Sequence, residues 1–287
     1  MQAIAAQPTD QKEFRFTMKE FRYLSAIVYD QAGIVLKDQK KNMVYSRLVR
    51  RLRELDLKSF QEYCQLLESG RGYEETGFLI NAITTNLTKF FRENHHFEHL
   101  AQVALKDVVG QSAKTGRNRL RIWSAGCSSG VDPYSIAMTL SANFTRLSAW
   151  DAKILATDLD TSMVARGKEG RYRPEDLENV PASYRKRYFS PSPCGQEMIA
   201  SDSLQKLITF KQLNLLKYWP LKGPFDVIFC RNVMIYFDEQ TKSKLIHRFA
   251  QMLKPGGWLY IGHSESILDA DAQFKLIGRT TYCRRGT

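Results

Sequence analysis

Hydrophobic positions recur at helical spacing through the first third of the chain, from about Phe14 to His99, and strand-like runs are rare there. Residues 38–55 (DQKKNMVYSRLVRRLREL) place Val44, Leu48 and Leu52 on one side of a helix, with Leu55 continuing the stripe. Such a stripe indicates a helix that packs against a core. The pattern predicts a small all-helical domain, which we assign to residues 1–75.

Short apolar runs separated by helix-like segments dominate the rest of the chain. They follow residues 110–118 (GQSAKTGRN), which predict a loop, and they are LRIWSAG, AKILATDLD, LITFKQLN, FDVIFCRN and GWLYIGHS. This alternation is typical of an α/β fold whose mostly parallel sheet is covered on both faces. The last run, FKLIGRTTYCRR, predicts two further short strands around Gly278. We assign residues 76–287 to this second domain.

One segment, residues 172–211, interrupts the alternation. It contains four prolines and Gly195 before the strand-like stretch LQKLITF. Connections in α/β units are usually short, roughly 2 to 6 residues. We therefore predict a small inserted subdomain in this segment.

A strand, a glycine turn and a helix follow one another in LRIWSAGCSSGVDPYSIAM. The turn contains Gly126 and Gly130, and Pro133 lies in the first turn of the predicted helix. Glycines let a ligand approach the backbone, and a helix start offers free N–H groups. The turn lacks the Gly-Lys-Ser/Thr of a phosphate-binding loop and the GxGxxG of a dinucleotide site. It indicates a nucleotide-type site, although a purely structural turn would look similar.

Polar residues end the strands that follow. Asp158 ends the second strand, where an acid can accept hydrogen bonds from ribose hydroxyls, although Asp158 or Asp160 could instead cap a helix. The third and fourth strands are followed by Asn214 and Leu215, and by Arg231, Asn232 and Tyr236. Ligands of such sheets bind outside the carboxyl ends of the strands, so we expect these residues to converge.

Together these features resemble the class I S-adenosylmethionine-dependent methyltransferases. More narrowly, TTNLTKFFREN at residues 84–94, CSSGVDPYSIAM and FCRNVMIYF resemble the chemotaxis receptor methyltransferases, the CheR family, over nearly the whole chain. The resemblance implies an α/β fold: a class I Rossmann-like methyltransferase domain with a small N-terminal all-helical domain and an inserted antiparallel β subdomain. It also implies methyl transfer from S-adenosylmethionine to glutamate carboxylates of bacterial chemoreceptors, with S-adenosylhomocysteine as product.

The resemblance also implies roles for individual residues. The positions matched to cofactor contacts are Asn86, Thr88, Arg92, Gly126, Val131, Asp132, Asp158, Asn214, Leu215, Arg231 and Asn232. Arg92 and Tyr236 match positions near the transferring methyl group, whereas taken alone Arg92 could form a surface ion pair with Glu93 or Glu98.

One position departs from the family pattern, which usually has Gly-Glu-Glu-Pro-Tyr where this chain has Gly130, Val131 and Asp132 before Pro133. Val131 cannot accept a hydrogen bond through its side chain. We therefore expect weaker cofactor binding than in the family, unless Asp132 or a water replaces the missing acid.

Carboxylate methylation suits these residues, because a glutamate with a pKa of about 4.3 is already ionised at neutral pH. No general base is required, and the enzyme mainly has to hold the carboxylate oxygen in line with the methyl group. Arg92 can fix an anion and Tyr236 can orient an oxygen.

Histidines offer a rival chemistry. His95 and His99 are spaced to bind a metal ion, but His96 occupies the place of the glutamate in HExxH. We expect packing or helix-capping roles and no metal site. His263 follows the fifth strand, where it could line the pocket or make a strand-end hydrogen bond.

The chain is strongly basic, with 42 Lys and Arg against 30 acids and a formal net charge of +12. Such a charge attracts nucleic acid, an anionic membrane surface or an acidic protein. Beside the apolar stripe of residues 38–55 lies a basic arc of Lys40, Arg47, Arg50 and Arg51, which is either a solvated helix face or a docking surface for acidic receptor helices.

Two alternatives to the chemoreceptor methyltransferase remain. RNA methylation is disfavoured because only Tyr45 could stack a base beside the basic arc. A cofactor-binding regulatory module with weak or no catalysis is suggested by Val131.

The remaining features concern the cellular setting. Five scattered cysteines without a CxxC pair indicate reduced thiols. The first residues lack a secretory pattern, and no run reaches the roughly 18 apolar residues of a membrane span. We expect a cytoplasmic monomer recruited to chemoreceptor arrays, without nucleic acid or membrane insertion. The resemblance adds a receptor tether peptide and a regulatory protein as further partners of some members.

Overall fold

The computed structural model describes residues 12–70, 72–144, 146–267 and 273–286. The chain forms two compact units, Met1–Thr84 and Thr85–Thr287. The boundary expected after residue 75 falls inside α4 (Gly72–Ile83), because Leu79, Ile80 and Ile83 continue the buried face of that helix. The division therefore comes after the helix, not within it.

The first unit is all-helical, as predicted. Its helices are α1 (Met18–Ala32), α2 (Lys41–Glu54), α3 (Phe60–Glu68) and α4. Thr17 caps α1 in a capping box with Glu20, and a left-handed Gly33 ends it. In α2 the predicted stripe is confirmed, since Val44, Leu48 and Leu52 are fully buried.

Two arginines of the basic arc hold this unit together. Arg47 Nη1 donates to the carbonyl oxygens of Ile83 (2.6 Å) and Thr84 (2.8 Å), satisfying the C-terminal end of α4. Arg51 donates through Nε (3.0 Å) and Nη2 (2.6 Å) to the carboxylate of Glu75, which is only 5% exposed. Tyr63 Oη also donates to Glu75, at 2.9 Å.

The second unit is built on a seven-stranded sheet in the order β6-β2-β1-β7-β8-β10-β9. Its strands are β1 (Arg119–Ala125), β2 (Asp151–Asp158), β6 (Ile208–Gln212), β7 (Phe225–Cys230), β8 (Leu253–Ile261), β9 (Phe274–Gly278) and β10 (Thr281–Arg284). The first five strands in the order are parallel, and β10 is antiparallel to both of its neighbours. The five predicted parallel strands and the pair around Gly278 are therefore confirmed.

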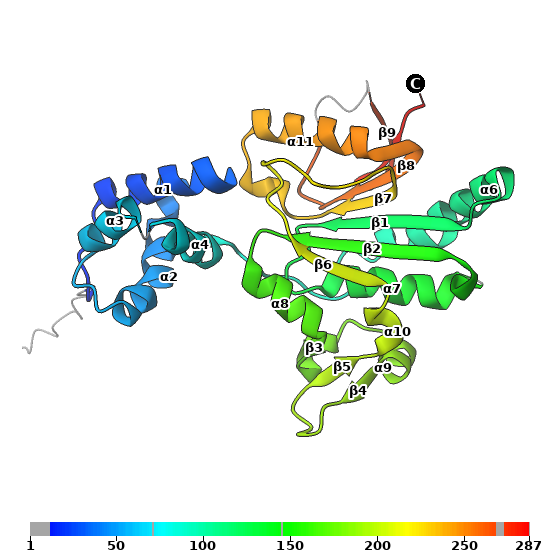
Figure 1. Cartoon of the computed structure of the whole chain (residues 1–287), viewed down its shortest axis with the longest axis horizontal. Coiled ribbons are helices and arrows are strands. Elements are labelled where there is room, and N and C mark those ends of the chain that lie inside the picture. Colours follow the sequence, from blue (N-terminus) through cyan, green and yellow to red (C-terminus); the bar gives the residue numbers. More distant parts are fainter. Residues whose placement is uncertain (1–11, 71, 145, 268–272, 287) are drawn as a thin grey trace, which may run out of the picture. The chain divides into compact units, whose positions relative to one another are not determined.

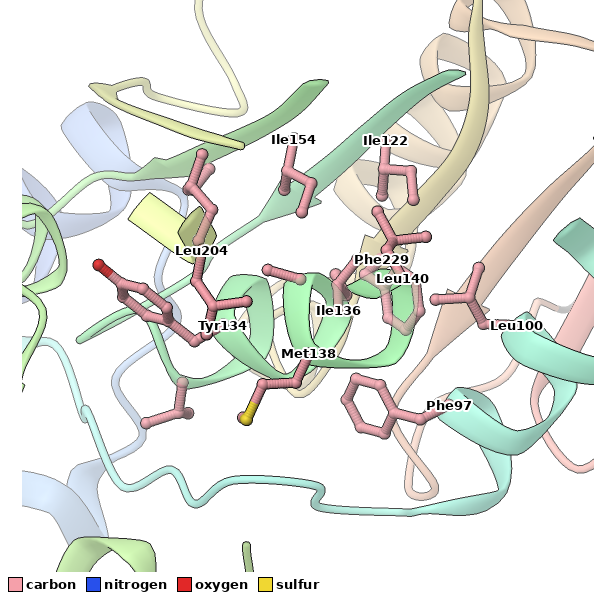
Figure 2. Packing of buried hydrophobic residues seen from close by; sticks show 14 of the residues in the cluster. Phe97, Leu100, Ile122, Tyr134, Ile136, Met138, Leu140, Ile154, Leu204 and Phe229 are labelled. Carbon is pink, nitrogen blue, oxygen red and sulfur yellow. The ribbon is translucent and has the colours of Figure 1, made fainter. Parts of the chain in front are cut away.

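Helices cover both faces of this sheet, with α7 (Val131–Asn143) and α8 (Thr161–Glu169) on one side and α11 (Glu239–Met252) on the other (Figure 1). Side chains alternate along β1: Ile122 joins the core under α7, whereas Trp123 joins the core under α11. Figure 2 shows the first of these cores, where Ile136 and Leu140 of α7 lie near Ile122 and Phe229 of the sheet.

The stretch predicted as a loop at residues 110–118 is largely helical. The continuous helical segment before β1 consists of α5 (His95–His99), a π-helical turn (Leu100–Ala104) and α6 (Leu105–Thr115). Val108 and Ser112 are buried, and the other residues of the stretch up to Thr115 form the exposed face of α6. The helix ends only at Gly116, which is left-handed with φ 68°.

The predicted insertion is a three-stranded antiparallel sheet in the order β3-β5-β4 (Figure 1). It contains β3 (Arg171–Tyr172), α9 (Ala182–Tyr188), β4 (Phe189–Pro191), β5 (Met198–Ala200) and α10 (Asp202–Gln205). The strand β6 belongs to the main sheet, so the insertion ends before Ile208 rather than at Lys211. Tyr172 anchors it, since its hydroxyl donates to the Ser129 carbonyl at 2.9 Å.

The three histidines of α5 pack against the sheet end, as expected. His99 Nδ1 lies 2.8 Å from the Tyr260 hydroxyl, and His95 Nε2 lies 3.1 Å from the carbonyl oxygen of Arg279. His96 is fully buried, and its Nε2 lies 3.2 Å from the same oxygen and 3.1 Å from Thr280 Oγ1. Within the residues that the structure describes, no helix is both long and apolar enough to cross a membrane.

Replacing Glu75 by Gln tests the role of the Arg51–Glu75 pair. We expect the free energy of unfolding of the helical unit to fall by about 2 to 3 kcal/mol, because Arg51 loses a charged partner in a partly enclosed site. The loss stays below that of a fully enclosed pair, since the Arg51 side chain is 22% exposed. Urea denaturation measures the change. Glu74→Gln, an exposed acid of the same helix, is the matched control, and equal effects of the two variants would contradict the assignment.

His96 gives a pH prediction. Burial lowers its pKa from the ordinary 6.5 to about 3, and the nearby charge of Arg231 acts in the same direction. The unfolded chain therefore takes up a proton that the folded chain excludes, so stability is complete above pH 6.5 and falls as pH drops toward 3. The loss approaches about 1.4 kcal/mol per pH unit.

We expect His96→Gln to remove this part of the pH dependence, measured as the slope of unfolding free energy between pH 7.5 and pH 5. The exposed His247→Gln is the control and should keep the wild-type slope. An unchanged slope for His96→Gln would show that His96 is not responsible.

Candidate active site

The glycine turn after β1 is tied to the end of β2. The backbone N–H groups of Gly126 and Cys127 both donate to the Thr157 carbonyl, at 2.7 and 2.9 Å. Gly126 has φ 72°, and a Cβ there would overlap the Val233 side chain from the loop after β7. A side chain at residue 126 would therefore push the end of β1 away from the loop after β7.

Asp158 lies at the carboxyl end of β2, half-buried beside this turn. Its Oδ2 accepts from the Ser128 N–H at 2.6 Å and its Oδ1 from the Asp160 N–H at 2.9 Å. Burial raises the pKa of Asp158, and these backbone hydrogen bonds oppose the rise. Asp160 is the residue that caps α8, through Ser162 and Met163, so Asp158 has no capping role there.

The segment at residues 85–94 reaches the same sheet edge. Asn86 Nδ2 donates to Asp160 Oδ2 at 2.9 Å, and Ser128 Oγ donates to Asn86 Oδ1 at 3.2 Å. Thr88 is half-buried in the same segment. Arg92 Nη1 donates to the Leu87 carbonyl at 3.3 Å.

Arg92 also has the ion pair that its sequence neighbourhood suggested, since its Nε lies 3.8 Å from Glu93 Oε1. The Arg92 side chain nevertheless keeps 28% of its surface exposed. It is thus held by its own segment without being enclosed.

Arg231, predicted as a cofactor contact, is enclosed by protein groups. It is 6% exposed, and its Nη1 donates to both Asp132 oxygens at 3.1 and 3.2 Å. Its Nη2 donates to the Arg92 carbonyl. Burial raises the pKa of Asp132, and Arg231 opposes the rise. Val131 is only 4% exposed and belongs to the apolar core under α7.

The loop after β7 is held by Glu265, a residue that the sequence analysis missed. Its carboxylate accepts from the N–H groups of Asn232 (3.0 Å), Ile235 (3.2 Å) and Gly262 (2.5 Å). Burial raises the pKa of Glu265, and these bonds oppose the rise. An acid four residues beyond the end of β8, within GHSE, was the available signal.

Asn232 has φ 59°, so Glu265 stabilises a left-handed residue at the strand end. Tyr236 lies beyond it, and its hydroxyl is 3.5 Å from the Thr85 carbonyl.

Asn214 and Leu215 shape the turn after β6. Asn214 Oδ1 accepts from the Leu216 N–H at 2.9 Å. Leu215 is buried, and its carbonyl accepts from Arg248 Nη1 at 2.6 Å and from Trp219 Nε1 at 3.2 Å. These hydrogen bonds hold the backbone of the turn in place, and the Asn214 side chain lies half-buried at the sheet edge.

These residues suit a nucleoside-type ligand. The ends of β6, β2, β1 and β7 are neighbours in the sheet, so their residues share one edge. The Asp158 carboxyl group and the amides of the site asparagines offer partners for hydroxyl and amide groups. In the part of the chain that the structure describes, no group of three or more His, Cys, Asp or Glu residues could hold a metal ion.

Two family models together match most of the chain. Residues 86–283 match the model of the CheR methyltransferase SAM binding domain, and residues 19–84 match that of the CheR methyltransferase all-alpha domain. The first match contains every predicted cofactor residue, and the second contains the basic arc.

Curated relatives extend the match over most of the chain. A probable chemotaxis protein methyltransferase of Rhizobium etli is 46% identical and is aligned over 89% of this chain and 96% of its own. The chemotaxis protein methyltransferase of Escherichia coli is 44% identical, with 91% and 89% covered. Chemotaxis protein methyltransferase 2 of Pseudomonas aeruginosa is 41% identical, with 94% and 95% covered. With both domain models and these relatives in agreement, the chain belongs to the CheR family of S-adenosylmethionine-dependent methyltransferases.

Proposed function

We propose that this protein transfers the methyl group of S-adenosylmethionine to glutamate carboxylates on the cytoplasmic helices of chemoreceptors. The observation that carries the proposal is the pinned carboxylate of Asp158 beside the glycine turn, within a domain that matches the CheR SAM binding model. The names of the relatives, chemotaxis protein methyltransferases, support the receptor as substrate.

The cofactor, when bound, supplies a methyl group on a sulfonium that a carboxylate can attack directly. Asp158 would accept from the ribose hydroxyls with the lone pairs that its two backbone bonds leave. The Gly126 turn would admit the cofactor close to the backbone. Asn86, Thr88, Asn214, Leu215 and Asn232 are proposed to complete the contacts.

Val131 departs from the family pattern, and the structure gives Val131, Asp132 and Arg231 partners within the protein. Val131 packs into the core, and Asp132 is already engaged by Arg231. Of the two outcomes expected from the sequence, this ion pair favours weaker cofactor binding over replacement of the missing acid by Asp132. We propose that Asp132 and Arg231 support the site as a pair.

Positioning is the proposed source of catalysis. The receptor glutamate arrives ionised, so the protein has only to hold one oxygen near the methyl group and in line with the sulfur. Arg92, partly exposed, is proposed to bind the carboxylate by charge-assisted hydrogen bonds. Tyr236 is proposed to orient an oxygen beside it.

Receptor docking is assigned to the basic arc of α2. Lys40 and Arg50 are exposed and would face acidic receptor helices, whereas Arg47 and Arg51 shape the surface through their bonds inside the unit. Such charges mainly raise the association rate. We also propose that the protein is a cytoplasmic monomer at receptor arrays. A receptor tether peptide would add a strand to the β3-β5-β4 sheet, and a regulatory protein would be a further partner.

Transfer of tritiated methyl to receptor-containing membranes tests the proposed activity. We expect label on the receptor with the wild-type protein and a loss on the order of 100-fold or more with Arg92→Ala, because the carboxylate loses its charged partner. Label on RNA would instead support an RNA methyltransferase. Bound cofactor without transfer to either acceptor would indicate a regulatory module.

Asp158→Asn tests the ribose contact. An amide of nearly the same shape loses the charged acceptor and one of the two backbone hydrogen bonds to residue 158, so we expect affinity for S-adenosylhomocysteine to fall roughly 10- to 100-fold. Isothermal titration calorimetry measures the change. Asp151→Asn, at the opposite end of the same strand, is the control and should bind like the wild type. Equal affinity of the two variants would refute the ribose role of Asp158.

A further inference from the structure

A compact charge cluster lies beneath Arg92, and its central member is Glu93. Glu93 Oε1 is 2.9 Å from His263 Nδ1 and 3.8 Å from Arg92 Nε, while Oε2 is 3.6 Å from Arg231 Nη2 and 3.6 Å from His96 Nδ1. The Glu93 side chain is only 10% exposed. We call these five residues the Glu93 cluster; the sequence predicted for Glu93 only an ion pair with Arg92, and the proposed cofactor contacts do not include it.

The backbone around Arg92 is strained. Phe91 has φ 51° and Glu93 has φ 54°, so a left-handed residue precedes and follows Arg92. Bulky residues rarely adopt this conformation, and it persists only where surrounding contacts impose it. Two contacts do so here: the Phe91 N–H donates to Ser135 Oγ at 3.1 Å, and Arg231 Nη2 donates to the Arg92 carbonyl. The turn therefore fixes the direction in which Arg92 leaves the backbone.

Arg231 links this turn to the rest of the site. It is buried between two carboxylates, Asp132 at the start of α7 and Glu93 in the turn. A buried guanidinium with an acid on one side alone would be drawn toward that side, because charges interact strongly in a poorly solvated site. Glu93 supplies the second negative charge. Burial opposes the ionisation of Glu93, but His263 and Arg231 outweigh it and hold the pKa of Glu93 below its ordinary value.

We propose that Glu93 is a positioning residue for methyl transfer, which acts by holding Arg231 under the strained turn and thereby fixing the orientation of Arg92. The inference rests on the proposed role of Arg92. Glu93 itself need touch neither cofactor nor substrate. Its loss should therefore matter only while Arg92 is present, which separates it from a residue that merely stabilises the fold.

A double-mutant cycle tests this dependence. The variants are Glu93→Gln, Arg92→Ala and the combination of both, and each is measured for methyl transfer to receptor membranes and for S-adenosylhomocysteine affinity by calorimetry. We expect Glu93→Gln to slow transfer at saturating cofactor by about 10- to 100-fold, the effect of losing one charge-assisted contact. In the Arg92→Ala background the same change should have less than about a twofold effect on either measurement.

Glu98→Gln is the matched control, since it removes one negative charge from an exposed acid of α5 in the same region. It should transfer at the wild-type rate. Glu93→Asp keeps the charge and tolerates a left-handed backbone, so it should retain more activity than Glu93→Gln. If Glu93→Gln does not fold, Glu93→Asp takes its place in the cycle.

The inference is overturned if the fold-losses of Glu93→Gln and Arg92→Ala multiply in the double variant. It is also overturned if Glu93→Gln is indistinguishable from Glu98→Gln, or if Arg92→Ala keeps wild-type transfer and affinity. The proposed function fails separately, when the wild-type protein labels no receptor. In that event the inference still requires Glu93→Gln to weaken S-adenosylhomocysteine binding when Arg92 is present, and to change it less than about twofold in the Arg92→Ala background.

Discussion

The site depends on a small set of backbone hydrogen bonds at the carboxyl ends of β1 and β2. Thr157 accepts from two consecutive N–H groups of the glycine turn, and Asp158 accepts from the N–H groups of Ser128 and Asp160. These bonds fix the Asp158 carboxyl group beside the glycine turn. Because β1 and β2 are paired over seven residues, the ends of both strands have little freedom to move. The other site residues are arranged around this fixed point.

Buried acids organise the surrounding loops in the same way. Glu265 gathers three N–H groups from the loop after β7 and the end of β8, and Glu75 gathers Arg51 and Tyr63 in the helical unit. A buried carboxylate is stable only when such donors surround it. Each acid therefore connects segments that are distant in sequence, and this explains why the basic arc of α2 has both structural and exposed members.

Local patterns predicted the elements well. The stripe of Val44, Leu48 and Leu52 and the alternating strands reflect burial on one or two faces, which is encoded within a few residues. The loop expected at residues 110–118 was largely wrong, because small polar residues also suit the exposed face of a helix such as α6. The end of the insertion was misplaced because β6 pairs with a strand some fifty residues away.

Local patterns could not predict which residues pair when they are distant in sequence. Arg51 pairs with Glu75, and Arg231 with Asp132 and Glu93, across separations that periodicity does not report. The roles of the site residues came from their resemblance to family motifs, and those roles remain predictions. Glu265 was missed, and Glu93 was expected only as an ion-pair partner of Arg92, because the other donors around each acid are brought together only by the fold.

The hydroxyl of Tyr172 connects the inserted sheet directly to the turn that begins α7, through the carbonyl of Ser129. If a peptide on the insert changes the affinity for a ligand at the glycine turn by some factor, that ligand changes the affinity for the peptide by the same factor. Thermodynamic reciprocity of this kind requires no movement of the main sheet. The Tyr172 hydroxyl is a contact through which a ligand on the insert and a ligand at this sheet edge could affect each other's binding.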